Sequence, residues 1–191
     1  AAGFSHVSTD TRKIEKGSLF IAIKGPNFDG HDFIDEAARN GAGGAVVSRD
    51  IPSPKAGFAI IRVKDAIRAL GGIAKFHRSR FDIPVIALTG SNGKTTTKEM
   101  LALILSAKYK VLKNEGTENN FIGVPQTLLK LDERREIAVI ELGTNHPGEI
   151  GYLADIVQPN CGVILNAGPS HLEFFGSVEN VRREKLDLLK R

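Results

Sequence analysis

The chain has a single cysteine and no long apolar run. Cys161 stands alone among 191 residues, so no disulfide can form within the chain, and a lone cysteine is typical of a reducing compartment. The first residues have neither the basic start nor the apolar run of a secretion signal. No stretch approaches the roughly 18 apolar residues that a membrane-spanning helix needs. We therefore expect a cytoplasmic protein without a membrane partner.

Aromatic residues and one-sided charge are also scarce. Aromatics make up 6% of the chain and the formal net charge is only +4. Single-stranded nucleic acid is usually bound by basic grooves with interleaved aromatic residues, and no such cluster is visible. The pairs Arg134-Arg135 and Arg182-Arg183 are typical of solvated faces. We expect no nucleic-acid partner, although the excess of positive charge is compatible with nucleotide phosphates.

Apolar patterning predicts two α/β domains. In residues 1–82, short apolar runs at 19–23, 44–47 and 59–63 accompany one helical pattern at 33–42, which indicates a small α/β domain. An amphipathic pattern over residues 65–81 predicts a helix that leads into the second domain, residues 83–191.

The second domain alternates short strands with longer helices. Strands are expected near residues 85–88, 137–142 and 163–166, and a helix near 95–107. This alternation is typical of a parallel sheet with crossover helices. The last amphipathic pattern, at 178–189, has no terminating glycine or cap, so we expect the natural chain to continue.

A glycine-rich turn between a strand and a helix is the strongest local motif. Its residues are Gly90, Ser91, Asn92, Gly93, Lys94, Thr95 and Thr96. The amides of such a turn and the start of the following helix attract phosphate. We expect Lys94 to reach the terminal phosphates of a nucleotide and the Thr95 hydroxyl to coordinate Mg²⁺. Leu88 stands where the general motif has its first glycine, so the loop is a shortened variant.

Two further side chains follow predicted strands. Glu141 ends an apolar run and would lie at the same sheet edge as the phosphate loop, where phosphoryl transfer needs acidic metal ligands. His171 follows the next strand and would reach that edge too. Taken alone, Glu141 could be a solvated strand-end residue, and a lone histidine is more often structural than a ligand.

These segments together resemble the Mur ligase family over nearly the whole chain. Residues 89–96 resemble the family's ATP loop, 116–125 its asparagine-rich loop, and 166–173 its metal-binding histidine segment. Lys185 stands where these ligases carry a carbamylated lysine. The resemblance implies ATP and two Mg²⁺ ions, one held by Thr95 and Glu141 and the other by His171 and the Lys185 carbamate. It assigns catalysis to Lys94, Glu141, His171 and Lys185.

The first domain resembles the family's UDP-substrate domain, through residues 8–12, 17–22 and 25–31. The resemblance implies substrate contacts from Asp10, Arg12, Asn27, Asp29, Gly30 and His31, together with Asn119 and Asn120 of the second domain. Arg12 suits a diphosphate because its planar guanidinium donates two hydrogen bonds at once. Taken without the resemblance, the region is equally compatible with a surface loop rich in turn residues.

Residues 141–150 and 171–177 resemble the members that add D-alanyl-D-alanine to UDP-N-acetylmuramoyl-tripeptide, although Thr144 and Phe174 depart from the usual pattern. The resemblance implies an ATP-dependent, monomeric ligase of peptidoglycan synthesis, and thus of cell-wall biogenesis and cell division, with an acyl-phosphate intermediate. Members carry a third domain, so we expect a fragment that cannot complete ligation alone. The alternatives are another Mur ligase or a folylpolyglutamate synthase, against which residues 146–148 argue, or a non-catalytic nucleotide-binding module.

Overall fold

The computed structural model describes residues 3–190 and divides the chain into two compact units, residues 1–70 and 71–191. Helix α2 (Ala66–Arg78) runs across this division. Both units are α/β structures with parallel sheets; the sequence predicts the α/β class of both and the parallel sheet of the second. The division after residue 82 stays a prediction. None of the helices within residues 3–190 is long and apolar enough to cross a bilayer.

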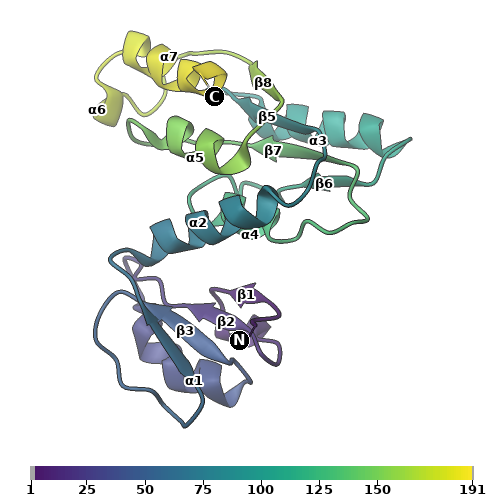
Figure 1. The fold of residues 1–191 in the computed structure, drawn as a ribbon. Coiled ribbons are helices and arrows are strands. Elements are labelled where there is room, and N and C mark those ends of the chain that lie inside the picture. The colour runs from purple at the N-terminus through teal and green to yellow at the C-terminus, as the bar shows by residue number, and fades with distance from the viewer. Residues whose placement is uncertain (1–2, 191) are drawn as a thin grey trace. The chain divides into compact units, whose positions relative to one another are not determined.

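The first unit is a four-stranded parallel sheet with the order β1-β2-β3-β4 (Figure 1). Its strands are β1 (Val7–Ser8), β2 (Leu19–Ile21), β3 (Gly44–Val47) and β4 (Ala59–Arg62). Its helical elements are the 3-10 turns η1 (Thr11–Lys13) and η2 (Gly30–Phe33) and helix α1 (Ile34–Arg39). Strands β2 and β3 are buried at every position, as expected for runs of apolar residues inside a parallel sheet.

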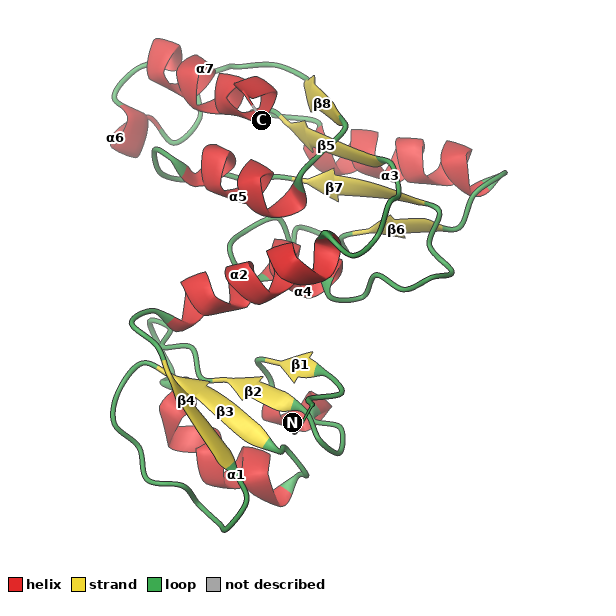
Figure 2. Ribbon diagram, viewed as in Figure 1, coloured by secondary structure: helices red, strands yellow, loops and turns green. Residues whose placement is uncertain are grey.

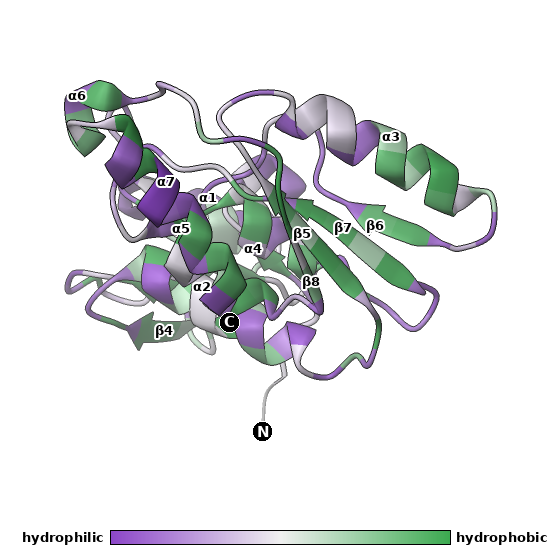
Figure 3. Ribbon diagram, turned by 90° about the horizontal axis from the view of Figure 1, so that it is seen from above, coloured by the Kyte–Doolittle hydropathy of each residue, from purple (hydrophilic) through white to green (hydrophobic). Residues whose placement is uncertain are grey.

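The second unit is a four-stranded parallel sheet with the order β6-β7-β5-β8 (Figure 2). Its strands are β5 (Val85–Thr89), β6 (Val111–Lys113), β7 (Ile137–Glu141) and β8 (Cys161–Ile164). Its helical elements are α3 (Lys94–Ser106), α4 (Gly123–Leu128), α5 (Glu149–Val157), α6 (Leu172–Phe175), α7 (Val178–Leu186) and η3 (Asp187–Lys190). Helices α3 and α5 lie on opposite faces of this sheet (Figures 1 and 3).

The two central strands of the second sheet carry its core. Strand β7 is buried at all five positions, and most of β5 and β7 is coloured as hydrophobic in Figure 3. Because β5 and β7 each have a strand on both sides and helices over both faces, apolar residues are favoured at every position rather than at alternate ones. Both strands end at the edge where the glycine-rich turn begins.

Strand β8 starts two residues earlier than the sequence pattern predicts. It pairs with β5 from Ile86↔Cys161 to Thr89↔Ile164, so the end of β5 sets the end of β8. The side chain of Asn160 accepts a hydrogen bond from Val85 N at 2.9 Å, which fixes this register at the other end. The register of β8 therefore depends on its partner strand more than on its own apolar run.

Candidate nucleotide site and substrate pocket

The glycine-rich turn has the geometry that the sequence predicts. Strand β5 ends at Thr89, and α3 begins at Lys94 after Gly93, whose φ of 79° lies in the left-handed region that favours glycine. The Lys94 amino group donates to Gly90 O at 2.9 Å. Amide groups at the start of α3 and a lysine cation thus meet at one point, the arrangement that attracts phosphate.

A second segment, residues 166–170, holds this turn in place through hydrogen bonds. Asn166 Oδ1 accepts hydrogen bonds from Ser91 N at 3.0 Å and Asn92 N at 3.1 Å, and Asn166 Nδ2 donates to Asn92 O. Ser91 Oγ donates to Gly168 O at 2.9 Å and lies 3.0 Å from Ser170 Oγ. The sequence did not predict this role of Asn166, although its position just after a predicted strand beside the phosphate loop could have indicated it.

Glu141 lies at the same sheet edge with its side chain buried. It pairs in register with Leu88, the residue just before the last position of β5. Its Oε1 accepts a hydrogen bond from Asn119 Nδ2 at 2.7 Å, whereas Oε2 has no hydrogen-bond partner among residues 3–190. The side chain of Asn114, which the sequence analysis missed, accepts from Glu141 N at 2.9 Å and donates to Glu141 O at 3.0 Å.

The oxygen of Glu141 that lacks a hydrogen bond fits a divalent cation. A buried carboxylate oxygen without a hydrogen bond is costly, and a hard cation would offset that cost. Within residues 3–190 no three His, Cys, Asp or Glu side chains gather closely enough to form a metal site by themselves. Mg²⁺ does not need such a cluster, because it usually binds one or two carboxylates together with phosphate oxygens and water. Glu141 Oε2 therefore fits a magnesium ion that arrives with a nucleotide, whereas a contact of the Thr95 hydroxyl with that ion stays a prediction.

Lys185 on α7 is buried, with 2% of its surface exposed. Its pKa is lowered from 10.5 to about 8, mainly by burial and also by the positive charge of Lys94, while Glu184 acts in the opposite direction. At neutral pH the neutral amine of Lys185 is more abundant than that of an ordinary lysine.

His171 is placed differently from the other proposed ligands. It precedes α6 with a φ of 50°, its side chain is exposed, and its carbonyl accepts hydrogen bonds from Phe174 N and Phe175 N. In the described part of the chain, no hydrogen bond or ion pair joins it to Glu141 or Lys185. The second ion site therefore stays a prediction.

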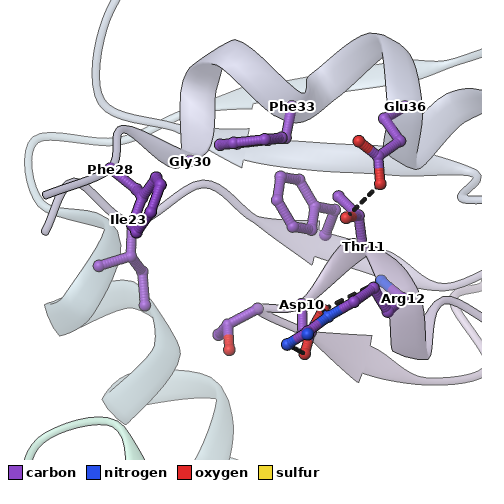
Figure 4. A pocket seen from close by; sticks show the side chains of 10 residues that line it. Asp10, Thr11, Arg12, Ile23, Phe28, Gly30, Phe33 and Glu36 are labelled. Atoms are coloured by element: carbon purple, nitrogen blue, oxygen red, sulfur yellow. Dashed lines mark hydrogen bonds and ion pairs between the residues drawn. The ribbon is translucent and has the colours of Figure 1, made fainter.

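A pocket of about 620 Å³ opens in the first unit (Figure 4). It is lined by Thr9, Asp10, Thr11, Arg12, Phe20, Ile23, Phe28, Gly30, Phe33 and Glu36. Phe28 is 73% exposed and stands with Phe33 and Ile23 on one side of the pocket, whereas Arg12 extends along the other side. The pocket thus combines flat apolar surfaces with a cation.

Arg12 is held by Asp10 in a paired arrangement. Its Nε donates to Asp10 Oδ1 at 2.9 Å and its Nη2 to Oδ2 at 2.7 Å, while the guanidinium remains exposed to solvent. The side-chain hydrogen bond from Arg12 lowers the pKa of Asp10 to about 2. The carboxylate thus orients a cation whose remaining donors are available to an anion.

The other residues of the first unit that are predicted to contact substrate do not all line the pocket. Asp29 Oδ1 bonds His31 N at 3.0 Å and His31 Nδ1 at 2.5 Å, and the buried His31 ring accepts from Ser48 N through Nε2 at 2.9 Å, so this pair builds the turn. Gly30 lines the pocket, and a Cβ there would lie 2.7 Å from Ile23 N. Asn27 lies in an exposed turn and does not belong to the lining.

The two predicted asparagines of the second unit serve the protein backbone and Glu141. Asn119 holds Glu141 Oε1, and Asn120 Oδ1 accepts hydrogen bonds from Ile122 N and Gly123 N, at 3.0 Å each, where α4 begins. A contact of either asparagine with a substrate stays a prediction.

A central parallel strand that leads through a glycine turn into a helix, beside a strand that ends in a buried carboxylate, defines a nucleotide-binding α/β protein of the phosphate-loop class. The chain belongs to the Mur ligase family. Residues 88–191 match the family model of the Mur ligase middle domain, and residues 3–78 match that of the Mur ligase family, catalytic domain.

The curated relatives of this chain are named as ligases. The chain is 43% identical, over 96% of its length, to the UDP-N-acetylmuramoyl-tripeptide--D-alanyl-D-alanine ligase of Bacillus subtilis. It is 46% identical, over 94% of its length, to the Escherichia coli enzyme of the same name. The chain spans 40% and 39% of the lengths of these two relatives.

Solved structures agree with this relationship. MurF from Acinetobacter baumannii superposes with a TM-score of 0.91 at 42% identity, over 98% of this chain and 41% of that one. MurF from Thermotoga maritima in complex with ADP superposes with a TM-score of 0.89 at 37% identity, over 97% of this chain and 43% of that one.

Proposed function

We propose that this chain supplies the UDP-substrate domain and the phosphate-loop region of an ATP-dependent ligase that adds D-alanyl-D-alanine to UDP-N-acetylmuramoyl-tripeptide. Such an enzyme acts in the synthesis of the peptidoglycan precursor. The observation that carries the proposal is the phosphate loop, held by Asn166, at the same sheet edge as the buried Glu141 oxygen that lacks a hydrogen bond. This geometry lies in a chain 36–46% identical to ligases named for that reaction.

The reaction needs activation because a carboxylate is a poor electrophile. Transfer of the γ-phosphate of ATP to the peptide carboxylate breaks the bond between the β- and γ-phosphates, releases ADP and forms an acyl phosphate. The amine of D-alanyl-D-alanine then attacks the acyl carbon, a peptide bond forms and phosphate leaves. Lys94 and the amides of the loop would hold the phosphates in line for the first step. The ADP complex of the Thermotoga maritima relative supports the use of a nucleotide.

Magnesium would supply positive charge that offsets the charge on the transferring phosphoryl group. Thr95 and Glu141 would hold one ion, and His171 with a carbamate on Lys185 would hold a second. An unmodified Lys185 ammonium would repel Mg²⁺, whereas a carbamate is a carboxylate-like ligand. The lowered pKa of Lys185 supports this modification, because only the neutral amine reacts with CO₂.

The pocket of the first unit suits the UDP end of the substrate. Phe28 and Phe33 offer faces on which a uracil ring could stack, and Arg12 can donate two hydrogen bonds to a diphosphate. The peptide end of the substrate would carry the carboxylate that is activated and then joined to the acceptor amine. We propose that this chain alone does not complete ligation, because the acceptor amine must also be held against the acyl phosphate, and positioning of this kind can supply roughly 7–11 kcal/mol of the barrier.

Identity favours the D-alanyl-D-alanine-adding enzymes over ligases of other specificity. The structure of the ligase that adds 2,6-diaminopimelate shares only 20% identity at a TM-score of 0.61, and this likeness reflects the fold alone. Curated relatives named for adding D-alanyl-D-alanine include proteins that are 36–46% identical to this chain.

Replacing Lys94 by alanine tests the proposal in the full-length ligase. We expect ligation to fall by at least about 100-fold, because the phosphates lose a preorganised cation, while thermal unfolding stays unchanged. Lys110→Ala, an exposed lysine beyond the end of α3, serves as the control and should keep full activity. Activity of Lys94→Ala within a few-fold of the unchanged enzyme would remove this loop from the mechanism.

A further inference from the structure

Lys98 is a fully buried lysine on α3, one turn beyond Lys94, and the proposed reaction assigns it no role. A buried ammonium is costly unless hydrogen bonds and opposite charge compensate it. Its Nζ donates to Asn114 O and to Gly116 O, each at 2.7 Å, and lies 3.2 Å from Glu99 Oε1. Both carbonyl groups belong to the segment between β6 and α4.

The segment that Lys98 holds is the one that surrounds Glu141. Asn114 bonds both backbone groups of Glu141 through its side chain, and Asn119 Nδ2 donates to Glu141 Oε1 at 2.7 Å. Lys98 Nζ lies 3.8 Å from Glu141 Oε2, beyond hydrogen-bond distance but close enough for electrostatic attraction. Glu141 Oε1 is therefore occupied and Oε2 is left without a hydrogen bond.

The chain packs closely on Asn119 at Gly143, so that Asn119 has little room to move. A Cβ on Gly143 would lie 2.3 Å from Asn119 Oδ1, and Gly143 N donates to Asn119 O at 2.8 Å. Asn119 is thus pressed against the chain that follows Glu141. A shift of residues 114–119 would move the amide that orients the carboxylate.

We propose that Lys98 is a positioning residue for Glu141. By holding the carbonyls of Asn114 and Gly116, it keeps Asn119 on Oε1 and leaves Oε2 for a divalent cation at the phosphate loop. This inference rests on the proposed function, in which Glu141 binds that cation. Lys94 does not share the task, because its amino group bonds the carbonyl of Gly90 in the loop itself.

The residue type matches this role. Three donors of a lysine ammonium suit two carbonyl groups and a nearby carboxylate, and its positive charge offsets that of Glu141 in a buried site. Groups that orient a metal ligand commonly change metal affinity by about 10- to 100-fold when they are removed.

The test compares metal-dependent and metal-free nucleotide binding in the full-length ligase. Calorimetry gives the affinity for ATP without metal, and electron paramagnetic resonance of Mn²⁺ gives the metal affinity in the presence of ATP. For Lys98→Met we expect about a 10-fold or larger loss of Mn²⁺ affinity, with metal-free ATP binding within about 2-fold of the unchanged enzyme. Lys98→Gln, which keeps two N–H donors but loses the charge, should fold even if Lys98→Met does not, and should lose Mn²⁺ affinity in the same direction.

Two further variants separate the possible outcomes. Lys113→Met is the matched control, because Lys113 pairs with Glu99 as Lys98 does but does not contact Glu141, and it should leave Mn²⁺ affinity unchanged. Glu141→Gln should weaken Mn²⁺ at least as much as Lys98→Met. If Lys98→Met and Lys98→Gln lower the unfolding temperature but keep Mn²⁺ affinity, Lys98 is only structural and the inference is wrong. If Glu141→Gln also keeps Mn²⁺ affinity, the ligand assignment in the proposed function fails as well.

Discussion

Lys185 has its side chain almost fully buried, and its pKa is lowered to about 8, first by burial and then by the charge of Lys94. In an unfolded chain the amine has its ordinary pKa of 10.5. Between these two values the unfolded state binds more protons than the folded state. Stability attributable to this residue therefore rises with pH through that window, and the full cost of the buried charge is present below about pH 8.

Replacing Lys185 by methionine should remove this pH dependence. The free energy of unfolding of Lys185→Met, relative to that of the unchanged chain, should be higher at pH 7 than at pH 10. The reason is that the unchanged chain carries the buried charge only at the lower pH. Urea unfolding in CO₂-free buffer at both pH values gives the two differences in free energy. Lys110→Met, an exposed lysine, should show equal differences at both pH values. Equal differences for Lys185→Met as well would mean that its amine titrates normally.

At the scale of elements, helices α2 and α5 approach closely at Gly71. A Cβ there would lie 2.2 Å from Tyr152 Oη and 2.8 Å from Ile156 Cδ1. The Tyr152 ring packs edge-to-face on Phe121 at a centroid distance of 5.3 Å, which limits how far its hydroxyl can move. Gly71 thus permits a contact that a larger residue would prevent, whereas the next residue, Gly72, has no atom within 4 Å of its would-be Cβ.

These adjacent glycines should respond to alanine in opposite directions. Gly71→Ala should destabilise the second unit by about 1–3 kcal/mol, since the clash outweighs the gain of about 1 kcal/mol in helix propensity. Gly72→Ala should stabilise it by about 0.5–1 kcal/mol, because only the propensity changes. Urea unfolding of both variants provides the comparison. Stabilisation by both would show that Tyr152 and Ile156 move aside at little cost.

Helices α5 and α7 are joined by a carboxylate rather than by apolar packing alone. Glu184 is buried, and its Oε2 accepts from Gly148 N and its Oε1 from Ile150 N, both at 2.7 Å, at the start of α5. Negative charge at a helix N-terminus is favourable, and the bonds tie α7, which carries Lys185, to the chain that follows β7.

Glu184→Ala should therefore cost about 1–3 kcal/mol of stability, because two amides at the start of α5 lose their acceptor. Glu179→Ala on the same helix removes a glutamate that pairs with the exposed Arg182 and Arg183 and lies in the first turn of α7, and it should cost less than about 1 kcal/mol. Thermal unfolding measures both variants. Equal stability of the two would indicate that water replaces Glu184 at the start of α5.

At the scale of the whole molecule, the two compact units carry different sites. The pocket with Arg12 lies in residues 1–70, and the phosphate loop lies in residues 71–191. Arg12→Ala in the full-length ligase should weaken binding of the UDP-linked substrate by about 10-fold, because hydrogen bonds to a charged group are lost, with ATP affinity unchanged. Calorimetric titration with each ligand gives both affinities, and Lys13→Ala, an exposed neighbour, is the control. An equal loss of both affinities would contradict the separation of the two sites.

The amino-acid sequence alone determined those features that depend on neighbours in the chain. The glycine turn, the start of α3 close to Lys94 and the buried strands β5 and β7 follow from local patterns of glycine and apolar residues. Glu141 was found because it ends such a run, and a parallel sheet brings strand ends to one edge. The family likeness rests on the same short segments.

Only the tertiary structure decided the features that join distant parts of the chain. Strand β6 was missed because its three residues have no long apolar run, and its place beside β7 comes from pairing. The contacts of Asn166 with the phosphate loop and of Lys98 with residues 114–116 depend on which strands lie next to one another. The lowered pKa of Lys185 arises in the same way, because burial and the nearness of Lys94 exist only once α7 packs in the folded unit.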